Sequence, residues 1–157
     1  MFSNLVFYLF SHSLLRWLLF IALVASLIRA WTSYRKKRPF SYIDNSIRHW
    51  TATLAHMQLV FGIILYSQSP IVKYFWQHKK EGFVDVPTTF FGLVHMLLML
   101  MAIVLITIGS SLAKRKPTDA DKHRTVLLWY TIALCVIFVA IPWPFSPLAQ
   151  RPYIRQF

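Results

Sequence analysis

The chain has 157 residues, is 57% hydrophobic and 14% charged, and carries a formal net charge of +12. This length suits one domain, and the mean hydropathy of +0.51 excludes an ordinary soluble globular protein. The Lys and Arg residues gather in short segments between apolar runs, as they do in membrane proteins whose loops face anionic lipid. We therefore expect a protein embedded in a lipid bilayer, with no nucleic acid as a partner.

Four apolar stretches are long enough to cross about 30 Å of hydrocarbon. They comprise residues 5–28, 50–67, 88–110 and 125–143. The connections between them are short, so neighbouring helices must run in opposite directions. The sequence predicts an all-α fold, an integral membrane up-down-up-down four-helix bundle, in which residues 1–157 form a single transmembrane domain.

The basic connections predict the orientation of this bundle. Residues 29–48 and 113–124 are rich in Lys and Arg, whereas the connection between the second and third stretches mixes Lys with Glu81 and Asp85. The positive-inside rule places the two basic connections in the cytoplasm and both termini on the outer side. The N-terminus lacks a basic segment and a cleavage site of signal-peptide type, so we expect the first stretch to be a retained helix.

Helix-boundary signals agree with these stretches. Asp44 or Asn45 could cap the second helix, and Pro87 with Thr88 fits the start of the third. Thr118, followed by two acids, suits the start of the fourth helix. The Pro-Trp-Pro motif at 142–144 predicts its end near the outer interface.

Two histidines lie at matching depth in the first and third stretches. His12 and His95 are each about seven residues from the outer end of their helix, or roughly 10 Å deep. The two helices run in the same direction and are diagonal partners in such a bundle. Bis-imidazole ligation of a haem iron requires two histidines on facing helices, and we predict His12 and His95 as the metal ligands.

Arg16 adds to this candidate site. It lies near the middle of its span and, at a spacing of four residues, on the same helical face as His12. An arginine keeps its charge at membrane depth and needs an anion, exposed carbonyls or water. None of the four stretches contains Asp or Glu, so a haem propionate is the anion that we expect. Snorkelling into a hydrated cavity, or pairing with a lipid phosphate, is the alternative.

A stripe of small and apolar residues surrounds His95. It consists of Gly92, His95, Met99, Ala102, Ile106 and Gly109. The glycines leave room either for a flat macrocycle or for the close approach of another helix. The second possibility makes the stripe a packing seam that carries a hydrogen-bonded histidine.

The cytoplasmic half contains further histidines whose depths do not match. His56 lies roughly 10 Å deeper than His49 or His123, which makes a second haem between His56 and His123 less convincing. His56, next to Gln58, could instead bind a quinone carbonyl, line a proton path or assist the first site. His49 and His123 suit the headgroup zone, and His78 suits a solvated loop.

Four segments together carry a resemblance to a known family. They are FSHSLLRW (10–17), LAHMQLVFGIILY (54–66), GLVHMLLMLMAIVLITIG (92–109) and DKHRTVLLWYTIALCVIFVAIPWP (121–144). Over nearly its whole length the chain resembles small bacterial four-span proteins classed as cytochrome-b-like, with the four-helix haem b arrangement of the cytochrome b561 group. The resemblance implies non-covalent haem b, electron transfer with the quinone pool and a place in the bacterial inner membrane. It implies His12 and His95 as ligands, and His56 and His123 as further cofactor-binding candidates.

The residues leave other interpretations open. The chain could be a haem-free accessory or assembly subunit, whose buried polar residues contact partner subunits or lipid. A small transporter is a third possibility, with Arg16, His56 and His95 lining a polar path, although the span interiors lack the proline breaks typical of transporters. No HExxH motif or Cys/His cluster suggests metal-dependent hydrolysis.

Overall fold

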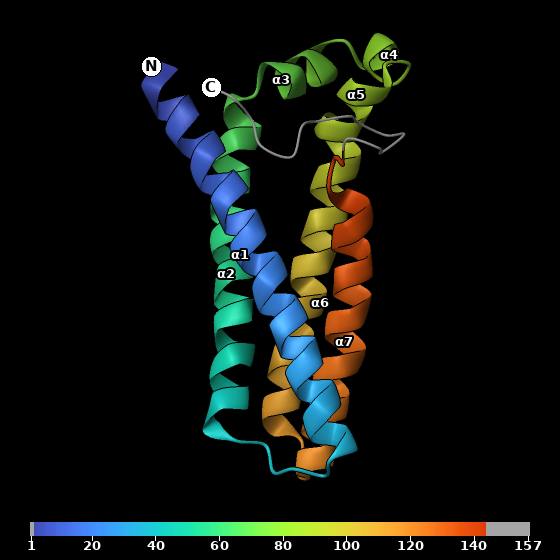
Figure 1. The fold of residues 1–157 in the computed structure, drawn as a ribbon. Helices are drawn as coiled ribbons and strands as arrows, with labels where there is room; N and C mark the ends of the chain where they lie inside the picture. Colours follow the sequence, from blue (N-terminus) through green and yellow to red (C-terminus); the bar gives the residue numbers. More distant parts are fainter. Residues whose placement is uncertain (1, 144–157) are drawn as a thin grey trace.

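The computed structural model describes residues 2–143, and within this range the chain is helical with short connections. The long helices are α1 (Phe2–Arg35), α2 (Tyr42–Gln68), α6 (His95–Arg115) and α7 (Asp119–Ala140). Figure 1 shows them packed side by side in alternating directions. Helix α1 packs against α2 and α7, and α6 packs against the same two helices, so α1 and α6 occupy opposite corners of the bundle.

Three of these helices are long and apolar enough to cross a membrane. The stretches concerned are Leu5–Arg35, Val86–Arg115 and Asp119–Ala140. Their surfaces agree with contact to lipid, because large apolar side chains such as Phe7, Ile21 and Val139 are exposed. Helix α2 does not reach the same hydropathy, since polar residues such as His56 and Gln58 interrupt its apolar part.

The structure corrects several predicted boundaries. Most of the predicted connection 29–48 is helical: α1 continues to Arg35, and α2 begins at Tyr42. The cap of α2 is Ser41 rather than Asp44 or Asn45. Asp44 lies one turn further on, where its carboxylate bonds back to the Ser41 backbone and completes a capping box.

Other boundary predictions are confirmed. Thr118 caps α7, with Asp119 and Asp121 in the first turn, and α7 ends at Ala140, two residues before Pro142. Asp85 caps the short helix α5 (Val86–Thr89), which contains Pro87 and Thr88 as expected. Pro144 lies outside the described residues.

The connection between α2 and α6 covers one end of the bundle. It contains α3 (Pro70–Gln77) and α4 (Lys79–Gly82), followed by α5, and Figure 1 shows α3 lying across that end. Phe75 of α3 is buried and packs on Gly92, where an added Cβ would lie 2.5 Å from the phenyl ring. Gly92 is therefore required for the close approach of α3.

Small residues set the helix spacing in the core. Ala55, Ala102 and Ala133 are fully buried where the helices meet. At Gly109 an added Cβ would lie only 2.3 Å from Cβ of Trp129, so α6 and α7 approach each other too closely for any side chain there. Gly92 and Gly109 thus accommodate packing partners, in agreement with the packing-seam alternative.

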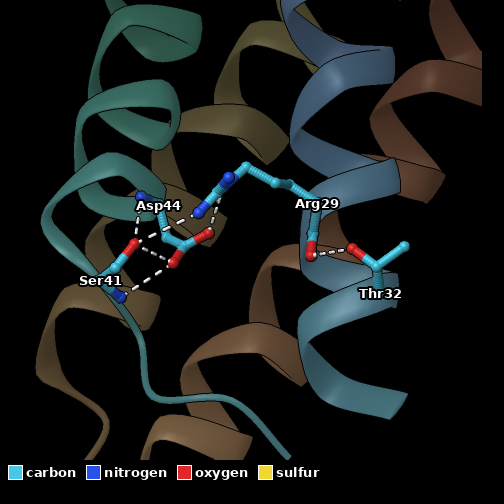
Figure 2. A network of polar contacts seen from close by, with 4 residues as sticks. All are labelled: Arg29, Thr32, Ser41 and Asp44. Carbon is cyan, nitrogen blue, oxygen red and sulfur yellow. Dashed lines mark hydrogen bonds and ion pairs between the residues drawn. The ribbon is translucent and has the colours of Figure 1, made fainter. Parts of the chain in front are cut away.

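A polar cluster joins α1 to the start of α2 (Figure 2). Arg29 Nε donates to Asp44 Oδ1 at 2.7 Å, and the Ser41 backbone N–H donates to Asp44 Oδ2 at 2.8 Å. Burial alone would raise the pKa of Asp44, but the hydrogen bonds from Arg29 and Ser41 outweigh it and lower the pKa below its usual 3.8. The charged carboxylate therefore fixes the register between α1 and α2.

This cluster predicts a loss of stability in acid. A carboxyl group whose pKa is lower in the folded state stabilises the fold above its unfolded pKa, and this contribution disappears as the pH falls through the folded pKa. We expect the Tm of the detergent-solubilised protein to fall between about pH 5 and pH 2, and Asp44→Asn to reduce that slope. Glu81→Gln, at an exposed position, is the matched control. If the Tm of Asp44→Asn fell as steeply with decreasing pH as that of the wild type, Asp44 would not be the group that causes the loss of stability in acid.

Candidate functional site

His95 is the first residue of α6 and follows a π-helical segment, η1 (Phe90–Val94). Its Nδ1 lies 2.8 Å from the carbonyl oxygen of Ala140, at the end of α7. Because a carbonyl can only accept, Nδ1 carries the ring proton and Nε2 has the free lone pair. A histidine whose Nδ1–H is held by a backbone carbonyl is oriented in the way that metal-ligating histidines usually are.

The π-helical segment before His95 accepts a hydrogen bond from α2, and the donor is itself held by α3. Tyr66 of α2 donates its hydroxyl to the Gly92 carbonyl at 2.7 Å, and Trp76 of α3 donates Nε1–H to the Tyr66 oxygen at 2.9 Å. Single π-turns inside α-helices are frequent at functional sites. Here the π-turn connects the position of His95 to α2 and to the covering helix α3.

His12 faces α2. Gln58 Nε2 lies 3.2 Å from His12 Nε2, and Gly62, one turn further along α2, leaves the space in which the imidazole lies. The amide nitrogen can only donate, so His12 Nε2 accepts and Nδ1 carries the proton. His12 Nδ1 and Gln58 Oε1 are buried without a hydrogen-bond partner among the described residues. Both candidate ligands therefore have their lone pair on Nε2.

The two histidines lie in the same half of the bundle, on diagonal helices. His12 contacts Gln58 in the half of α2 that leads to α3, and His95 contacts the last residue of α7. His12 interacts electrostatically with His95, and Arg16 interacts with both. The structure thus brings together the three residues of the predicted outer site.

Arg16 lies within this group and also beside an aromatic ring. Its guanidinium carbon is 5.5 Å from the centre of the Trp17 ring, and Trp17 in turn makes an edge contact with Trp143. A guanidinium at this distance from a ring face is stabilised by the ring quadrupole. Trp143 donates its Nε1–H to the Phe138 carbonyl at 2.8 Å, which places this aromatic pair at the C-terminal end of α7.

The remaining histidines lie apart from His12, His95 and Arg16. His56 is exposed and donates to Thr107 of α6 at 3.0 Å, because the Thr107 hydroxyl already donates to the Ile103 carbonyl. His123 is only 1% exposed and packs against the Phe40 ring. His49 and His78 are exposed. His56 and His123 therefore face different neighbours and do not form a pair like His12 and His95.

Sequence reasoning missed the partners of both central histidines. Gln58 was assigned to His56, its neighbour in sequence, but Gln58 is buried against His12 while His56 is exposed on the other side of α2. The spacing of four residues between Gln58 and Gly62, which places both on one face of α2, was the available signal. Nothing in the sequence indicated the Ala140 carbonyl, because it depends on how α7 ends.

No group of three or more His, Cys, Asp or Glu side chains arranged to hold a metal ion occurs within residues 2–143. A haem iron needs only two axial protein ligands, since the porphyrin supplies the other four. Comparison with protein-family models, with curated proteins and with solved structures finds no match to this chain.

Proposed function

We propose that this chain is a membrane protein that holds one haem b through His12 and His95 and relays electrons within the bilayer. The observation that carries the proposal is that both imidazoles, on diagonal helices in one half of the bundle, keep the lone pair on Nε2. Nε2 is a common haem-ligating nitrogen, and a Nδ1–H bond to a carbonyl increases the basicity of the ligand.

The surroundings of His12 fit such a ligand. The Nε2 lone pair is met only by the Gln58 amide, whose own oxygen has no hydrogen-bond partner in the described part of the chain. The amide is thus held weakly, and rotating it away would free Nε2 for an iron at the cost of one hydrogen bond. Arg16, charged and coupled to both histidines, is placed to neutralise a haem propionate.

The chemistry that haem supplies when bound is the transfer of one electron at a time. The chain itself contributes the two imidazoles and the Arg16 charge. In this proposal the electron partner is the quinone pool or a respiratory redox protein, because the outward-facing surface of the helices is apolar and contacts lipid.

The proposed membrane arrangement has four spans, with α2 as the fourth. A less apolar helix can span a bilayer when its polar residues face the protein interior, and Arg48, Thr51 and Gln58 of α2 are buried. The basic segments at 35–38 and 114–116 lie at the same end of the bundle (Figure 1). The positive-inside rule then places this end in the cytoplasm and both termini on the periplasmic side of the inner membrane.

The test is an absorption spectrum of the detergent-purified protein, oxidised and dithionite-reduced, with a pyridine haemochrome assay to count haem per chain. We expect the spectrum of six-coordinate, low-spin haem b and about one haem per chain. A protein that stays colourless after expression with ample haem would overturn the proposal. If that protein were folded and bound to other membrane subunits, an accessory role would replace it.

A further inference from the structure

A second polar site lies at the opposite end of the bundle from His12 and His95. A small pocket opens there between α1, α2 and α7, and it has space for about one water molecule. The polar residues in its wall are Ser26, which is hydrogen-bonded to Thr51, and Arg29, Asp44, Arg48 and His123. Figure 2 shows the part of this wall in which Arg29 meets Asp44. Its apolar wall consists of Ala30, Phe40, Ile47 and Val126.

Two side chains in this wall have buried nitrogen atoms without protein partners. Both ring nitrogens of His123 and the Nε of Arg48 make no hydrogen bond to the described residues. His123 is 1% exposed and Arg48 is 7% exposed, so bulk water does not satisfy these groups. Leaving such atoms unpaired destabilises the fold, most of all when the group is charged. Their common location points to a bound species that accepts hydrogen bonds.

The charge of the pocket wall is not balanced. Arg29 and Asp44 form an ion pair with a 2.7 Å contact, and Asp44 also accepts bonds from Ser41. The Arg48 guanidinium has only neutral partners, namely the Ser110 carbonyl and hydroxyl and the Asn45 side chain. Nearby on α7, Lys122 is paired with Asp119, which interacts electrostatically with His123. The net charge around the pocket is therefore the single positive charge of Arg48.

A buried guanidinium needs an anion or a full set of hydrogen-bond acceptors. The enclosed space is about that of one water molecule, which suits a monatomic anion such as chloride better than a carboxylate or phosphate group, and chloride carries the single charge required. We propose that the pocket binds one chloride ion, held by Arg48 Nε–H and one ring N–H of His123. This inference is independent of haem, because neither residue belongs to the His12 and His95 site.

The binding of chloride should stabilise the folded protein. We would measure the Tm of the purified protein, with whatever cofactor it carries, in sodium chloride and in sodium gluconate at equal ionic strength. Gluconate is too large for the pocket and controls for screening. In the wild type we expect Tm to be higher in chloride by on the order of 3 °C at a concentration about tenfold above the Kd. The difference should vanish in His123→Phe and persist in His49→Phe, at an exposed position on α2.

A second measurement does not depend on the folding of a variant. The linewidth of the chloride-35 NMR signal should increase when wild-type protein is added, and bromide should reverse the increase by competition. Equal Tm values in chloride and gluconate, with no excess linewidth, would overturn the proposal and leave water as the partner of these nitrogens. Retention of the chloride effect by His123→Phe would overturn it as well.

Discussion

If His95 is a haem ligand as proposed, replacing it with alanine should reduce the haem bound per chain by at least about tenfold. Mutation of a group that only orients a metal ligand already lowers metal affinity about 10–100-fold. Removal of the ligand itself should therefore lower the affinity for haem by more than about tenfold. The substitution also removes the hydrogen bond between His95 and the Ala140 carbonyl, so the folded state must be checked by circular dichroism. Haem per chain would be measured by the pyridine haemochrome assay.

The matched control for this experiment is His49→Ala. His49 is exposed and lies on α2 outside the proposed site, so its removal should leave the haem content unchanged. Imidazole added to His95→Ala during haem loading should restore part of the spectrum, because it can enter the space left by the side chain. A folded His95→Ala protein with a full complement of haem would show that His95 is not a ligand.

Replacing Gly109 with alanine should destabilise the contact between α6 and α7 strongly. The new Cβ would lie 2.3 Å from Cβ of Trp129 and 2.9 Å from its Cγ. These atoms are next to the helix backbone and cannot rotate away, so the helices must separate. Overpacking of this kind costs about 1–3 kcal/mol. This loss outweighs the gain of about 1 kcal/mol in helix propensity that alanine has over glycine.

Gly62→Ala is the matched control for this overpacking effect. There an added Cβ would lie 3.5 Å from His12 Cε1, which is an ordinary van der Waals contact. The propensity gain therefore remains, and Tm should be unchanged or slightly higher, whereas Gly109→Ala should lower it by several degrees. If both variants had the same Tm, the close approach of α6 and α7 at Gly109 would be disproved.

The sequence predicted the helical architecture because its signals are local. Apolar length, basic connections and the Thr118 cap each depend on a short segment, and the structure confirms an all-helical chain with three helices apolar enough to span a membrane. The diagonal placement of the His12 and His95 helices also agrees, since the short α1–α2 and α6–α7 connections make the helices of each pair antiparallel neighbours.

What the sequence did not predict depends on contacts between distant segments. Arg48 was assigned to a basic connection, but it points into the bundle, where it bonds to Ser110 sixty-two positions away. A charged side chain is expected to face solvent, and only the contacts of Arg48 with Ser110 in the folded bundle explain why it is buried. The hydrogen bond from Tyr66 to η1, and the support of Tyr66 by Trp76, could not be predicted either, because no sequence pattern marks a π-turn.

The π-turn before His95 changes which face of the helix each of its neighbours contacts. One residue more or less turns an α-helix by about 100°, so η1 offsets the face that precedes it from the face that follows it. At the start of this segment Phe90 is buried, and directly after the segment His95 meets the end of α7. Deleting one residue from Phe90–Val94 would restore a regular helix in which only one of these two orientations could persist. The π-turn thus allows one continuous helix both to bury Phe90 beneath the covering helices and to direct the His95 imidazole toward α7.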